Sequence, residues 1–126
     1  MFRLKSDFHK HTLFSGSEEE LKDKVFYITT QNFSLRFTSS DLKPFLPDDL
    51  KHYIQDDLFE QILVSKEFKK GRSVLGHFIN ASKLTVYYIP FKNEQQHTHH
   101  ILLLAFGEIN PGHFILEQEA LLEATD

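Results

Sequence analysis

Histidine pairs are the residues of this chain whose types and spacing best suit chemistry. His9 and His11 stand two residues apart in a polar segment near the N-terminus. If that segment is extended, the two imidazoles point to the same side of the chain. Imidazole nitrogens bind divalent metals, and Asp7 could supply a further ligand or orient one of the rings. The spacing alone therefore allows a metal site.

The segment around this pair, residues 7–15, reads Asp-Phe-His-Lys-His-Thr-Leu-Phe-Ser. It resembles the opening motif of PHP-type metal-dependent phosphoesterases, whose H-x-H pair binds divalent metal. The resemblance implies further His and Asp ligands on the later strands of a barrel. A chain of 126 residues is too short to build that barrel, and no Thr-Asp-His sequence follows. Because a motif without its structural context is weak evidence, we interpret the match as coincidental.

A second histidine cluster occupies residues 97–100, at the start of an apolar run. On a strand, His97 and His99 share one face and could hold a metal with His77 or Glu94 as a third ligand. No cysteine or carboxylate completes a metal-ligand spacing around them. We therefore predict solvated histidines at the entrance of a strand and no metal. The alternative is a small metal-binding or metal-dependent hydrolytic protein that uses His9, His11, His97 and His99.

Other catalytic signatures are missing from the sequence. There is no G-x-S-x-G elbow, no phosphate-binding glycine loop and no cysteine, which excludes a thiol nucleophile and disulfides. His52 and His77 could face a haem or flavin, but we interpret them as structural residues. The acidic pairs 48–49 and 56–57 stand at predicted helix starts, where helix capping explains them. We predict a protein that is not an enzyme and holds no cofactor.

Charge and hydropathy exclude two classes of partner. Fourteen Lys and Arg are scattered among eighteen Asp and Glu, and the formal net charge of −4 argues against binding to nucleic acid. The longest apolar run, residues 101–106, is far shorter than the roughly eighteen residues that span a bilayer. The first residues lack the apolar stretch of a secretory signal. We therefore expect a cytoplasmic protein with no membrane partner.

Periodicity predicts the elements of the first two-thirds of the chain. Residues 17–23 begin with Ser17 and carry Glu20 three residues later, which is typical of a capping box. Residues 24–29 and 33–37 alternate and are predicted to form a hairpin. Residues 38–41 and 47–49 contain capping residues, so a run of short helices is expected to extend to Gly71.

The last third switches to the period of two that strands show. Strands are expected from residue 73 to 79, from 84 to 89 and from 97 to 106, with Pro90 ending or bulging the middle one. Residues 113–124 follow Asn110-Pro111-Gly112 and are predicted to form a terminal helix. The resulting fold class is α+β: a five-stranded antiparallel sheet, built from two strands, a helical segment and three strands, with a C-terminal helix.

The order of these elements over residues 24–109 resembles that of PAS domains, with the apolar run 101–106 as the central fifth strand. The chain departs from that family in lacking Asp-x-x-Gly after the first strand, and longin-like and other profilin-like domains share the order. Length and composition predict one domain over residues 1–126. With the resemblance it divides into an N-terminal strand or arm (1–23), a PAS-like core (24–109) and a terminal helix (110–126). The resemblance also implies a role in signalling.

The predicted terminal helix carries a narrow apolar seam on an acidic background. We expect the seam either to pack on the sheet or to bind a protein partner or a second copy of the chain. The predicted function is a non-catalytic PAS-like sensory or protein-interaction module that forms a dimer or docks a partner through its sheet face and terminal helix. The seam, and hence the predicted partner-binding set, consists of Phe114, Ile115, Leu121 and Leu122.

Overall fold

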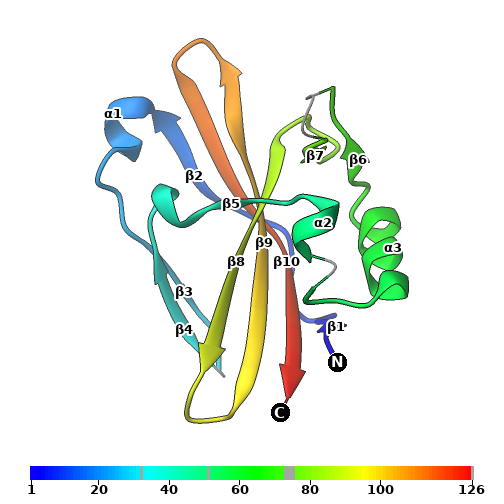
Figure 1. Cartoon of the computed structure of the whole chain (residues 1–126). Helices are drawn as coiled ribbons and strands as arrows, with labels where there is room; N and C mark the ends of the chain where they lie inside the picture. Colours follow the sequence, from blue (N-terminus) through cyan, green and yellow to red (C-terminus); the bar gives the residue numbers. More distant parts are fainter. Residues whose placement is uncertain (32, 51, 73–75, 126) are drawn as a thin grey trace.

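The computed structural model describes residues 1–31, 33–50, 52–72 and 76–125, and a long, curled antiparallel sheet forms its centre (Figure 1). The strands of this sheet follow the order β1-β10-β9-β8-β7-β6, while β2 pairs with β10 and β5 pairs with β8. Their bounds are β1 (Arg3–Leu4), β2 (His11–Ser17), β5 (Lys43–Pro44), β6 (Lys69–Lys70), β7 (Phe78–Ile79), β8 (Thr85–Asn93), β9 (Thr98–Asn110) and β10 (His113–Thr125).

Two sets of smaller elements cover the faces of this sheet. On one face lies a separate two-stranded sheet formed by β3 (Phe26–Thr29) and β4 (Ser34–Phe37), together with α1 (Glu18–Leu21). The other face is covered by α2 (Pro47–Leu50) and α3 (Asp56–Ser65), which Figure 1 shows on the side opposite to β3 and β4. A short 3-10 helix, η1 (Ser39–Asp41), follows β4.

The predicted fold class is therefore wrong. In the described part of the chain the main sheet has eight strands rather than five, and α3 is the one helix longer than four residues. The predicted hairpin of residues 24–37 is confirmed, since Phe26 pairs with Phe37 and Thr29 with Ser34. It stands apart from the main sheet, because β3 and β4 pair only with each other in the described structure.

The largest error concerns residues 113–125, which form a strand and not the predicted helix. Pro111 and Gly112 make a tight turn in which Gly112 has a φ of 78°, and Asn110 pairs with His113 across it. Proline followed by a residue with positive φ is typical of a type II turn. The turn folds β10 back along β9 over almost its whole length. This pairing outweighs the helix propensity of the Glu, Ala, Gln and Leu residues in the segment.

Smaller predictions had mixed outcomes. The capping box at the start of α1 is confirmed, since the Ser17 hydroxyl accepts from the Glu20 backbone and the Glu20 carboxylate accepts from the Ser17 backbone. The strand expected from residue 73 to 79 begins outside the described residues; of its described residues, Phe78 and Ile79 form β7, and residues 76 and 77 are not in a strand. Pro90 was expected to interrupt β8, but β8 continues to Asn93. Pro90 lies beyond the residues that pair with β5, so its missing donor falls at an edge position.

The long strands separate two apolar cores. In β9 the side chains of Ile101 and Leu103 lie in the core beneath α2 and α3, whereas those of Leu102 and Leu104 lie in the core beneath β3 and β4. All four are at most 1% exposed. This confirms the expectation that the apolar run 101–106 is covered on both faces. The PAS resemblance itself stays a prediction.

The helices found in the described residues are all too short or too polar to cross a lipid bilayer.

Candidate functional site

The face of the sheet beneath β3 and β4 changes from apolar to polar toward one end. The register of β8, β9 and β10 places side chains from the three strands in rows across this face. An apolar row consists of Ile89, Leu102 and Leu121. The next row is Phe91, His100 and Glu123, and Arg3 of β1 extends it beside Glu123. The last row is Asn93, Thr98 and Thr125.

His100 lies at the centre of this polar end and is 1% exposed. Its ring stacks on Phe91 at 4.9 Å between centroids and an interplanar angle of 14°. The ring of Phe33, from the segment joining β3 to β4, lies 5.0 Å from His100 and 5.0 Å from Phe91. Two phenyl rings therefore pack on the imidazole: Phe91 belongs to β8 of the main sheet, and Phe33 belongs to the segment that joins β3 to β4.

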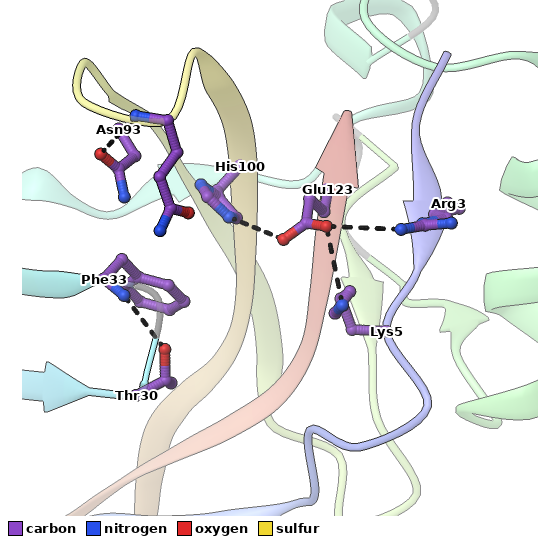
Figure 2. A network of polar contacts seen from close by, with 8 residues as sticks. Arg3, Lys5, Thr30, Phe33, Asn93, His100 and Glu123 are labelled. Carbon is purple, nitrogen blue, oxygen red and sulfur yellow. Dashed lines mark hydrogen bonds and ion pairs between the residues drawn. The ribbon is translucent and has the colours of Figure 1, made fainter. Parts of the chain in front are cut away.

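One nitrogen of the buried imidazole has a partner and the other has none. His100 Nε2 lies 3.2 Å from Glu123 Oε2, as Figure 2 shows. A carboxylate can only accept, so Nε2 donates, and Nδ1 of a neutral ring is then an acceptor. Within the described structure neither Nδ1 nor the buried hydroxyl of Thr98, two residues away on the same face, has a hydrogen-bond partner. Two unpartnered polar atoms therefore belong to successive residues on this face of β9.

The charge of Glu123 is balanced from the N-terminal strand. Arg3 Nη2 and Lys5 Nζ each lie 3.6 Å from Glu123 Oε1, on the side away from His100 (Figure 2). Lys5 also ties its segment to β10 through a backbone hydrogen bond of 2.9 Å to Leu121. The side chains of Glu123 and Lys5 are 12% and 22% exposed, and that of Arg3 is 73% exposed. The Lys5 pair is thus the better shielded of the two.

Two hollows adjoin this polar end, and the Phe33 side chain lines both. One has a volume of about 200 Å³ and is lined by Lys5, Asp7, Thr30 and Glu123 among others. The second, about 250 Å³, lies between Phe33, Phe91 and the loop that follows Asn93. The Asn93 side chain fixes this loop by accepting hydrogen bonds from the backbones of Gln95 and Gln96.

A second buried carboxylate belongs to Glu119, also on β10. The register passes from Gln118 opposite Leu104 to Ala120 opposite Leu103, so Glu119 is the extra residue of a β-bulge. Glu119 is 2% exposed. Its Oε1 accepts a 2.8 Å hydrogen bond from Asn80 Nδ2 and lies 3.5 Å from Lys10 Nζ. Asn80 Oδ1 in turn accepts from the backbones of Ser82 and Leu84, so both ends of the amide are bonded.

A third polar pair joins Ser15 of β2 to His113 of β10, with 2.8 Å between Oγ and Nε2. Nucleophilic catalysis needs a hydroxyl and a base at such a distance, together with a group that orients the base. In the described ranges no carboxylate binds the other nitrogen of His113, and Ser15 is exposed. Ser15 and His113 therefore lie at the distance of a nucleophile and its base, but the pair lacks a group that orients the base and is not shielded from water.

The structure does not bring the predicted metal ligands together. His11 is the exposed first residue of β2, and His9 is exposed two residues before that strand. His97 lies in the β8–β9 turn with a φ of 54°. His99 is half-buried on the face of β9 opposite to His100. Glu94 lies 3.9 Å from Lys92, and across the described residues no three His, Cys, Asp or Glu side chains form a group that could hold a metal ion.

The predicted partner-binding residues all lie on β10 and do not form a helical seam. Leu121 and Leu122 are 3% and 0% exposed and point into the two different cores. Phe114 and Ile115 are half-buried near the β9–β10 turn, where Phe114 stacks on Phe106 at 5.8 Å. No observation tests whether they bind a partner, but the helical surface that the prediction assumed does not exist.

Sequence reasoning selected His97 and His99 and passed over His100. The alternation of Leu102 and Leu104 extends backward to His100 and Thr98, which places two polar side chains on a core face. That signal was present in the sequence. Its partner Glu123 was not identifiable, because the register of β10 depends on two irregularities, one at the turn and one at Glu119.

Comparisons of the chain with protein-family models, with curated proteins and with solved structures gave no match.

Proposed function

We propose that this protein is a non-catalytic module that binds a small molecule at the polar end of the sheet, beneath the β3–β4 hairpin. The observation that carries the proposal is the buried imidazole of His100, whose Nδ1 has no partner in the part of the chain that the structure describes. Leaving a buried polar atom unpaired costs about 1–3 kcal/mol, so such atoms are uncommon in folded proteins, and a missing hydrogen-bonding partner is one explanation for them. The two adjoining hollows offer space for a ligand.

A binding role fits the surroundings of His100 better than catalysis. Among the described residues, the polar partner of its side chain is Glu123, and the groups packed on its ring are phenyl rings. A general base needs a nucleophile or a substrate proton within hydrogen-bond reach. The Thr98 hydroxyl is the nearest candidate along β9, and it makes no hydrogen bond to His100.

Of the roles expected from the sequence, sensing fits this geometry better than docking through a sheet face. Along residues 101–105 of β9, both faces of the sheet are covered by the chain's own elements. A ligand that met His100 would also meet Phe33 and Glu123, and through Glu123 the N-terminal strand. Binding there would couple three segments that are distant in the sequence.

A fragment screen by protein-observed NMR tests this proposal. We expect fragments that shift the signals of Thr98, His100 and Phe33 in the wild-type protein. His100→Phe, which keeps an aromatic ring at the same place, should weaken those fragments by about tenfold, the effect of losing one hydrogen bond. His113→Phe changes a histidine outside the site and should leave binding unchanged. A screen in which no fragment shifts these signals, or in which His100→Phe binds the hits equally well, would overturn the proposal.

A further inference from the structure

Phe33 belongs to the linings of both hollows, whereas His100 belongs to neither lining. The centroid of the Phe33 ring lies 5.0 Å from the centroids of the His100 and Phe91 rings. The ring is half-buried, in contrast to Phe26 and Phe37 of the same hairpin, which are 5% and 2% exposed. Because Phe33 lies against the imidazole and lines both hollows, movement of this one side chain would extend both of them toward His100. Their combined volume would then reach the range of ordinary small-molecule sites, roughly 300–1,000 Å³.

The attachment of Phe33 permits such movement. Its backbone forms two hydrogen bonds with Thr30. Thr30 N donates to Phe33 O at 2.9 Å, and Phe33 N donates to Thr30 Oγ1 at 3.3 Å, the bond that Figure 2 shows. The hairpin that carries it pairs with no other strand in the described structure. A two-stranded hairpin is only marginally stable by itself, and its tip depends on the packing of side chains such as Phe33.

The groups at this place define the chemistry of a ligand. The position is occupied by a phenyl ring packed on two further rings, so a planar aromatic group fits it. His100 Nε2 donates to Glu123, which makes Nδ1 of the neutral ring an acceptor and requires a donor on the ligand. Lys5 and Arg3 are engaged by Glu123, and Lys92 lies 3.9 Å from Glu94, so the charges here are paired within the protein. A neutral ligand suits this balance better than an anion.

We propose that this site takes a neutral, planar heteroaromatic molecule whose ring N–H donates to His100 Nδ1 and whose ring takes the place of the Phe33 phenyl group. The proposal rests on the proposed function and specifies its ligand class. Phe33 then acts as an internal plug: without ligand its ring packs on the imidazole, and a ligand ring that can donate a hydrogen bond displaces it. The hydroxyl of Thr98 can donate or accept, and so suits a second polar atom on the same ring system.

Indole and benzofuran provide a matched pair of probes, since they differ mainly in the ring N–H. We expect the wild-type protein to bind indole saturably and to prefer it to benzofuran by about tenfold, measured by NMR titration of the full chain. His100→Phe should abolish the preference. Phe33→Ala removes the plug and should bind indole about tenfold more tightly than the wild type does, with the preference retained. Phe33→Leu, a milder truncation, should show the same trend if Phe33→Ala does not fold.

Other outcomes would overturn this inference. Equal affinity for the two probes, or no saturable binding of indole by the wild-type protein, would exclude the proposed donor. Unchanged or weaker binding by both Phe33 variants would exclude the plug. If fragments of another class still shift His100 in the wild-type protein and lose affinity in His100→Phe, the ligand class is wrong and the proposed function stands. If no fragment shifts His100, both are wrong.

Discussion

Glu119 and Glu123 stand four residues apart on β10, and their neighbours differ in whether every buried polar atom has a hydrogen-bond partner. Glu119 accepts from the Asn80 amide, whose other end holds a backbone turn, and Lys10 lies beside it. Glu123 faces His100, whose second nitrogen has no partner among the described residues, and is shared between two cations. Both carboxylates are shielded from water, but only the cluster around Glu119 has its polar atoms satisfied.

This difference separates a structural role from a binding role. A buried network in which every member is bonded stabilises one arrangement of the chain, and Glu119 fixes the position of the β7–β8 turn against β10. A buried network that leaves a donor or an acceptor without a hydrogen bond lowers the stability of the folded state. The row Phe91, His100 and Glu123 contains such an unpaired atom, His100 Nδ1. The neighbouring row on the same face consists of aliphatic side chains, so the face does not require a polar row for packing.

The largest expected effect in this comparison is at Asn80. Asn80→Ala removes the hydrogen bond to buried Glu119 and the two hydrogen bonds that hold the turn, so the free energy of unfolding should fall by about 3 kcal/mol. Denaturation with urea would measure this as a lower midpoint at an unchanged slope. Glu108→Ala removes an exposed carboxylate that accepts from the Gly112 backbone, and serves as the control with an expected change below about 0.5 kcal/mol. Equal changes in the free energy of unfolding for the two substitutions would contradict a structural role of the Glu119 cluster.

A much smaller effect is expected at His100. His100→Phe removes the hydrogen bond to Glu123 but also removes the unpaired Nδ1, and it keeps the stacking on Phe91. The free energy of unfolding should therefore change by less than about 1 kcal/mol. Thr98→Val removes the other unpaired atom and should be neutral or stabilising. A loss as large as that of Asn80→Ala would show that the imidazole serves stability, and the contrast between the two clusters would be lost.

The smallest effect concerns Tyr87, which lies on β8 opposite Leu104 and outside both clusters. Burial raises the pKa of the Tyr87 hydroxyl above its ordinary value of 10.0. Above that pH the unfolded chain loses this proton while the folded chain keeps it, so stability should decline as the pH rises through this range. Tyr87→Phe should remove that part of the decline, measured by urea denaturation between about pH 9 and pH 11. Persistence of the whole decline in the variant would mean that Tyr87 does not cause it.

Local signals in the sequence predicted local structure well. The capping box at Ser17, the hairpin of β3 and β4 and the two-sided burial of residues 101–105 depend on neighbouring residues, and the structure contains all three. The strand β10 was mistaken for a helix because its composition favours a helix, and the Pro111-Gly112 turn decides otherwise. With that strand mistaken, the pairing of His100 with Glu123 could not be predicted, although the place of His100 on a core face could have been.

The pairing of β1 with β10 joins opposite ends of the sequence, and this has a kinetic consequence. His100 and Glu123 lie on strands joined by a short turn, so they can meet early in folding. Lys5 and Arg3 must close a loop of nearly the whole chain before they reach Glu123, and the entropic cost of closure grows with loop length. We therefore expect the cations to dock late. Substitutions at Arg3 and Lys5 should then speed unfolding more than they slow folding.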